Sequence, residues 1–182
     1  LKKIVFFDSN FGFRKSQSYK SYNIFLDTII DISKNLNIKV YIKSKLTFKE
    51  SIAKSDKNIL SKLELIKKNK NITYLDSDLI TSKVIQNSDL TVSLFNTTTF
   101  YESIYLDVPA IFFDPSKKYK SYLKRLSQVK YQIAYDKDTL IKNIKILKKT
   151  KYRNKFKLDS IKFLKKEINI SQNHNLSKIF EY

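Results

Sequence analysis

The clearest guide to the fold is the stretch NSDLTVSLFNTTTFYESIYLDVPAIFFDP, residues 87–115. Its apolar runs predict one strand over 89–95 and another over 108–114, where Pro109 stands near the strand start, a position that tolerates proline. Residues 98–107 between them are predicted to form a helix. Runs that are apolar at nearly every position are typical of buried parallel strands, so the stretch indicates a βαβ unit.

The same alternation continues along the whole chain. Further strands are predicted over 2–8, 37–43, 71–76 and 131–135, and further helices over 22–36, 57–69, 79–88, 119–127, 136–149 and from about 158 to 168. This rhythm predicts an α/β fold, a Rossmann-like doubly wound parallel sheet of about six strands with helices on both faces. We expect residues 1–182 to form a single domain, with a C-terminal helix and tail over 150–182.

Composition excludes several kinds of site. The chain has no cysteine, which rules out disulfides and cysteine-based metal sites, and its single histidine, His174, argues against a histidine-based catalytic pair. No apolar run approaches the roughly 18 to 20 residues that a membrane-spanning helix needs. Because the chain begins with Leu1 and contains no methionine, we expect it to be a fragment of a larger, two-domain protein.

The net charge of +19 has two interpretations. Lysines at helical spacing, as in IKNIKILKKTKYRNK, indicate solvated helix faces in a compositionally biased chain. A positive field also attracts phosphates, so peripheral contact with an anionic membrane is a second expectation. No zinc-finger or RNA-recognition signature is present, so specific nucleic-acid binding is not expected.

In a doubly wound sheet, ligands bind beyond the carboxyl ends of the strands, and the most informative residues there follow the strand over 89–95. Asn96, Thr97, Thr98 and Thr99 combine hydroxyl groups with the free backbone N–H groups of a helix start, which suits a phosphate. Glu102 lies one turn further on. Two interpretations stay open: a phosphate cradle with Glu102 facing the ligand, or a capping box between Thr99 and Glu102.

Other strand ends offer weaker candidates. Lys43 follows the second strand and could reach a phosphate or be a solvated lysine. Arg14 lies beside Gly12, the only glycine, which allows either a close backbone approach or a turn. The triplet DSD at 76–78 imitates a metal-binding motif but is interpreted as a loop and helix cap. Neither a dinucleotide fingerprint nor a phosphate-binding P-loop is present.

The chain resembles the C-terminal, donor-nucleotide-binding half of a GT-B-type glycosyltransferase of bacterial capsule or lipopolysaccharide synthesis. The resemblance covers roughly residues 2–150 and is strongest over 87–115, with a Ser-Asp strand start, a threonine-rich turn and a helix bearing Glu102. The chain departs from the family pattern at Val108, where glycine is usual, and at Ser44 and Lys45, where His-Pro is usual.

The resemblance implies a role for each candidate residue. The turn over 96–99 would hold the donor diphosphate, and Glu102 would bind the ribose hydroxyls. The loop over 75–79, with Leu75 and Asp76, would frame the base, and Lys43 matches the lysine at a family strand end. Sugar transfer would need neither a metal nor a cofactor, because Arg14 and Lys43 would stabilise the leaving diphosphate.

The resemblance also implies partners that this chain would meet only as part of a larger protein. The general base and the site for a polysaccharide or lipid-linked acceptor would lie in an N-terminal domain. The protein would be cytoplasmic and peripheral at the inner face of the plasma membrane.

Alternatives of the same architecture remain. A CDP-alcohol phosphotransferase and a nucleotide-sugar epimerase share the fold, although epimerases need carboxylates and histidine for proton transfer. A non-catalytic module that binds nucleic acid or another polyanion is a further alternative. A response-regulator-like module would need an acidic cluster at the first strand end, where Asp8 stands alone, with Asp76 at the third.

Overall fold

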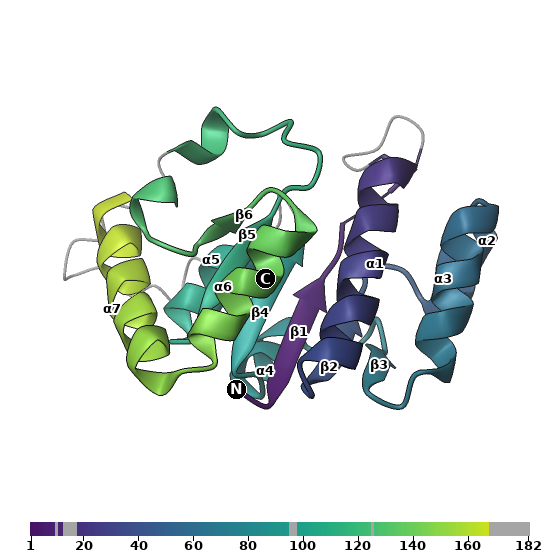
Figure 1. The fold of residues 1–182 in the computed structure, drawn as a ribbon, viewed down its shortest axis with the longest axis horizontal. Helices are drawn as coiled ribbons and strands as arrows, with labels where there is room; N and C mark the ends of the chain where they lie inside the picture. Colours follow the sequence, from purple (N-terminus) through teal and green to yellow (C-terminus); the bar gives the residue numbers. More distant parts are fainter. Residues whose placement is uncertain (10, 13–17, 95–97, 125, 168–182) are drawn as a thin grey trace.

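The chain folds around a six-stranded parallel sheet with the strand order β3-β2-β1-β4-β5-β6 (Figure 1). The computed structural model describes all residues except 10, 13–17, 95–97, 125 and 168–182. The strands are β1 (Lys3–Phe7), β2 (Lys39–Lys43), β3 (Ile72–Leu75), β4 (Leu90–Leu94), β5 (Ala110–Phe113) and β6 (Ile133–Ala134). Every pair is parallel, which confirms the Rossmann-like doubly wound prediction.

Each strand lies within its predicted range, because the central strands are apolar on both faces. All residues of β4 and β5 are buried. Strand order reverses between β1 and β4, which pair in register from Ile4 with Leu90 to Phe7 with Ser93. A ligand crevice is expected outside the carboxyl ends of these two strands, so the fold places the candidate loops at one edge of the sheet.

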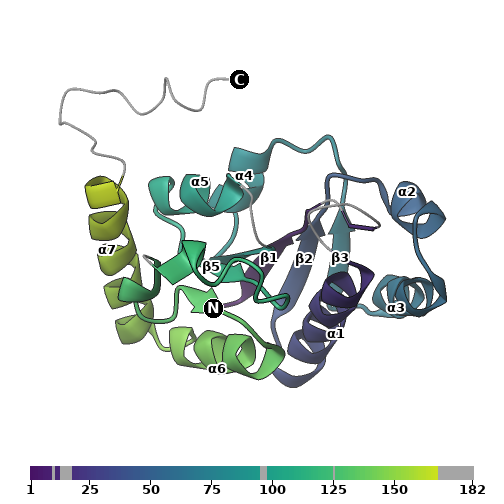
Figure 2. The same cartoon turned by 90° about the horizontal axis from the view of Figure 1, so that it is seen from above.

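Helices cover both faces of the sheet (Figure 2). On one face lie α1 (Tyr19–Asn35), α3 (Lys57–Lys68) and α6 (Lys137–Leu147), and on the other lie α4 (Thr81–Gln86) and α5 (Thr99–Tyr105). The helix α7 (Thr150–Glu167) stands at the β6 side of the molecule and contacts α5 and α6. Asp136 is the N-cap of α6 and accepts a hydrogen bond from the Thr139 N–H at 2.7 Å.

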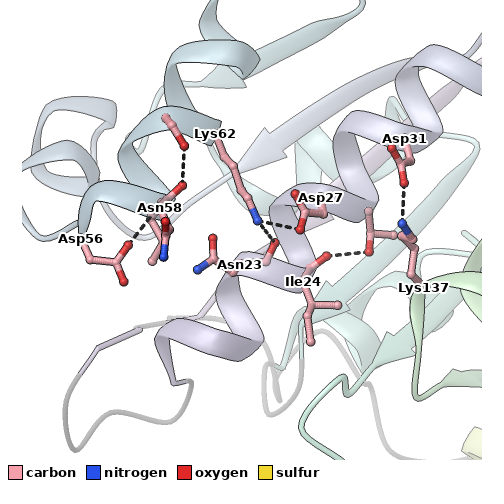
Figure 3. Close-up of polar contacts among 11 residues, drawn as sticks. Asn23, Ile24, Asp27, Asp31, Asp56, Asn58, Lys62 and Lys137 are labelled. Atoms are coloured by element: carbon pink, nitrogen blue, oxygen red, sulfur yellow. Dashed lines mark hydrogen bonds and ion pairs between the residues drawn. The ribbon is translucent and has the colours of Figure 1, made fainter.

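The helix α1 is the main link between the sheet and the other helices of its face. Its apolar side is buried, and Phe25 packs edge-on against Phe6 of β1 with ring centroids 5.8 Å apart. Its polar side forms ion pairs with neighbouring helices (Figure 3). The Lys62 ammonium of α3 lies 2.6 Å from Asp27, and the Lys137 ammonium of α6 lies 2.8 Å from Asp31.

The helix predictions need three corrections, the last of which concerns the final helix. The helix α2 (Phe48–Ala53) was not predicted, although Thr47 and Glu50 have the spacing of a capping box. The helix predicted over 119–127 is wrong: the segment forms two 3₁₀ turns, Tyr122–Lys124 and Leu126–Gln128. There the buried carboxylate of Asp114 accepts a hydrogen bond from the Tyr119 N–H at 3.1 Å and holds the segment near the end of β5.

The last helix begins eight residues before its predicted start at about 158, because its apolar side chains are sparse. Only Phe156, Phe163 and Leu164 are its buried large apolar residues, and they recur at the spacing of a single helix face. Lysines occupy much of the remaining surface. A sparse apolar pattern of this kind is easily interpreted as loop from the sequence.

Candidate functional site

The candidate site is the carboxyl edge of the sheet around the reversal between β1 and β4. The described candidates there are Lys43, Leu75, Asp76, Thr98, Thr99 and Glu102. Three others, Arg14, Asn96 and Thr97, lie outside the described residues. The described part of the site comprises the ends of β1, β2 and β3 and the start of α5.

The start of α5 follows β4 directly. Thr98 is the N-cap residue, but its side chain makes no capping hydrogen bond. The Thr99 hydroxyl lies 3.1 Å from the hydroxyl of Ser93, and Ser103 donates a hydrogen bond to the Thr99 carbonyl at 2.6 Å. The first contact joins the start of α5 to β4, the second lies within α5, and Glu102 follows in the first turn of this helix.

Glu102 is half-buried, and burial raises the pKa of its carboxyl group above the usual value. In the part of the chain that the structure describes, its carboxylate has no hydrogen-bond or ion-pair partner. The Glu102 N–H donates to the carbonyl of Thr98, 3.0 Å away. Glu102 thus keeps its full capacity to accept hydrogen bonds from a ligand.

The capping-box interpretation of Thr99 and Glu102 is wrong. A box requires the glutamate three residues after the cap, and the cap is Thr98 and not Thr99. The helix α2 shows the real motif: the Thr47 hydroxyl accepts from the Glu50 N–H at 3.2 Å, and the Glu50 carboxylate accepts from the Thr47 N–H at 2.8 Å.

Lys43 ends β2 and is buried, with 8% of its surface exposed. Its ammonium donates a hydrogen bond to the backbone carbonyl of Ser77, in the loop after β3. An ammonium group has three N–H donors, so this bond leaves two for another acceptor. The lysine therefore joins the ends of β2 and β3 at the candidate edge.

The loop after β3 is a hydrogen-bonded turn. The Asp76 carboxylate accepts from the Asp78 N–H at 3.2 Å, and the Asp76 carbonyl accepts from the Leu79 N–H at 3.3 Å. The DSD triplet is a loop, as predicted, but it does not cap a helix, because α4 begins at Thr81 with Ile80 as its N-cap. A cavity of about 430 Å³ under this loop is lined partly by Leu75.

A buried carboxyl group at the end of β1 was missed as a site residue. Asp8 is 3% exposed, and it accepts hydrogen bonds from the Tyr22 hydroxyl and from the Lys45 N–H, both at 3.2 Å. Burial raises the pKa of Asp8 to about 6, against the opposing effect of hydrogen bonds that include one from Ser44. The available signal was an aspartate directly after an apolar strand.

Aromatic residues enclose Asp8. The Tyr22 ring stacks on Phe11 with centroids 3.8 Å apart, and burial raises the pKa of the nearby Tyr74 to about 12. The hydroxyl of Tyr74 lies 2.9 Å from that of Ser51 in α2. These hydrogen bonds link the end of β1 to α1 and to the loop after β2, and they link β3 to α2, beside the crevice.

Two features are absent from the residues that the structure describes. No group of three or more histidine, cysteine, aspartate or glutamate side chains lies close enough to hold a metal ion. Within the same part of the chain, none of the helices combines the length and the apolar character that crossing a membrane requires.

Comparison with known proteins gives a family and a structural likeness. A family model described as "Polysaccharide biosynthesis PFTS motif protein" matches residues 12–144. Among solved structures, the chain is similar to a Methanocaldococcus jannaschii UDP-GlcNAc 2-epimerase in complex with UDP-GlcNAc and UDP, with 14% identity and a TM-score of 0.56. The match covers 80% of this chain and 38% of the epimerase chain. At this identity the likeness concerns the fold alone. No curated protein sequence matches the chain.

The family model spans most of the chain, from the loop after β1 to α6. The chain therefore belongs to the polysaccharide biosynthesis PFTS motif family.

Proposed function

We propose that this member of the polysaccharide biosynthesis family is the donor-binding half of a GT-B-type glycosyltransferase. The proposal rests above all on Glu102, a half-buried carboxylate without a partner among the described residues, next to the point where strand order reverses. A half-buried carboxylate with accessible oxygens and no partner among the described residues suits a ligand that supplies hydrogen-bond donors.

The ribose of a nucleotide-sugar donor would supply those donors. Its two hydroxyl groups can each donate a hydrogen bond to one oxygen of Glu102. Partial burial lowers the local dielectric and strengthens such bonds. The loop after β3, with Leu75 and Asp76, would then frame the base above the cavity that Leu75 lines.

Chemistry would occur at the bond between the sugar and the diphosphate. Negative charge develops on the leaving nucleoside diphosphate, and fixed donors stabilise that charge in the transition state. The remaining N–H donors of Lys43, the hydroxyl of Thr98 and the side chain of Arg14 are the proposed stabilising groups. The acceptor and the general base would come from the rest of a larger protein.

Isothermal titration calorimetry with UDP, GDP and CMP tests this proposal. Glu102→Gln should weaken binding of the preferred nucleotide at least about tenfold, since a hydrogen bond to a charged group contributes about 1.5–3 kcal/mol. The matched control is Glu50→Gln, whose carboxylate is used in the α2 cap and should leave nucleotide affinity unchanged.

The ribose assignment has its own test in the same titration. Wild-type protein should bind the 2′,3′-dideoxy form of the nucleotide more weakly than the ribonucleotide, and Glu102→Gln should bind both forms about equally. If the variant still prefers the ribonucleotide by the wild-type factor, Glu102 does not contact the ribose. If no nucleotide binds the wild-type chain, the donor-site proposal fails.

Nucleotide-sugar epimerisation is the second candidate, favoured by Asp8. Its carboxyl group lies at the crevice edge with a pKa of about 6, near the range in which an acid–base catalyst works at neutral pH. Nuclear magnetic resonance spectra of UDP-GlcNAc incubated with the protein distinguish the two candidates. Accumulation of the 2-epimer, abolished by Asp8→Asn, would favour the epimerase.

A further inference from the structure

A basic groove lies along α6, away from the nucleotide crevice. Its volume is about 730 Å³, and its lining includes four lysines, Lys130, Lys142, Lys145 and Lys149. Because α6 follows β6, it starts at the carboxyl edge of the sheet and runs toward the opposite edge. Most of the groove therefore lies on a different part of the surface from Glu102.

The lysines of this α6 groove form a concentrated positive surface. Lys142, Lys145 and Lys149 recur at spacings of three and four residues, so they project from one side of the chain, and all three are exposed. Within the described part of the chain, none of these three ammonium groups forms an ion pair. Among the described residues that line the groove, Asp138 is the only acidic one, and it stands near the start of α6.

Apolar and aromatic side chains complete the lining. Ile141 and Ile146 contribute from α6, and Tyr131 and Tyr152 contribute two rings, the second of them 44% exposed. The Lys130 ammonium lies 5.1 Å from the centre of the Tyr131 ring. A lining that combines lysines with isoleucine and tyrosine side chains is typical of protein surfaces that meet the headgroup layer of a membrane.

A short groove with these features fits separate phosphate groups better than a continuous polyanion. Asp138 stands among the lining residues at the start of α6, where it would repel the next phosphates of a nucleic acid backbone. We propose that the α6 groove is a docking site for the phosphate headgroups of anionic phospholipids and holds this side of the protein against a membrane surface. This proposal does not depend on the donor site, because the residues differ.

Co-sedimentation with vesicles tests the docking site. The protein should bind vesicles of phosphatidylglycerol and phosphatidylcholine and should not bind vesicles of phosphatidylcholine alone. Replacing Lys142, Lys145 and Lys149 together by glutamine should weaken binding roughly 100-fold, since each lysine near an anionic surface contributes about a factor of five. Replacing these exposed lysines by glutamine should not lower the melting temperature of the protein, which shows that any loss of binding is not a loss of folding.

A second triple variant controls for charge. Lys151, Lys155 and Lys162 lie on the exposed side of α7 outside the groove lining, and replacing them by glutamine lowers the net charge equally. This variant should keep its vesicle affinity within about threefold of the wild type, because its groove is intact. An equal loss in both variants would mean diffuse attraction and overturn the proposal. The proposal would also be overturned if the protein did not bind anionic vesicles. The same holds if it bound duplex DNA more tightly than vesicles and this binding depended on the three lysines.

Discussion

At the end of β1, Asp8 is a carboxyl group held almost out of contact with water. Burial raises its pKa from 3.8 to about 6, so the folded protein favours the protonated form more than the unfolded chain does. Its contribution to stability is present in full below about pH 4 and is lost as pH rises to about 6. Above that pH, the buried charge costs about 3 kcal/mol.

Asp8→Asn should remove this pH dependence. Between pH 4 and pH 7, the unfolding free energy of wild type should fall relative to that of the variant by roughly 2–3 kcal/mol. Urea unfolding of both proteins at several pH values measures the difference, in which the contributions of all other carboxyl groups cancel. If the unfolding free energies of the two proteins changed with pH in the same way, the raised pKa of Asp8 would be contradicted.

Two short helices that begin after threonine N-caps differ in how those caps work. In α2 the Thr47 side chain accepts a hydrogen bond from the backbone of Glu50, whereas in α5 the Thr98 side chain makes no such bond. The same residue type therefore stabilises one helix and leaves the start of the other open. The free cap of α5 stands at the candidate crevice, where a ligand could use it.

Thr47→Ala should destabilise the protein by about 1 kcal/mol, because it leaves a helix N–H group without its partner. Thr98→Ala is the matched control and should change the unfolding free energy by only a few tenths of a kcal/mol. Chemical denaturation of both variants measures the two values. Similar losses for the two would show that the cap bond of α2 contributes nothing measurable.

Over the whole molecule, a net charge of +19 makes self-repulsion a substantial cost of folding. The described ion pairs, such as those of Lys62 with Asp27 and Lys137 with Asp31, are partly exposed and offset little of that cost. Added salt weakens both the repulsion and these ion pairs. Because the repulsion is the larger of the two effects, salt should stabilise the fold overall.

Raising sodium chloride from 10 to 100 mM shortens the Debye length from about 30 to about 10 Å. The melting temperature should rise by roughly 2–4 °C, which corresponds to a gain on the order of 1 kcal/mol for a chain of this size. Differential scanning calorimetry at constant pH measures the shift. A fall in melting temperature would mean that the ion pairs outweigh the repulsion.

The local pattern of residues was enough to predict the six strands, the helices α1, α3 and α6, and the edge of the sheet where Glu102 lies. These features depend on apolar spacing between near neighbours in the chain, such as Phe25 and Ile29 in α1. The same reasoning missed α2 and mistook the segment after Asp114 for a helix. Short segments bury too few apolar residues for spacing to identify them.

The environment of each site residue followed from contacts between segments far apart in the chain. Asp8 is buried because Tyr22 and the loop at Lys45 enclose it, and Lys43 reaches Ser77 because β2 pairs with β3. Glu102 could not be distinguished from a helix cap until the start of α5 was known. Strand pairing and helix boundaries bring these groups together or keep them apart, and neither property is local to the residues concerned.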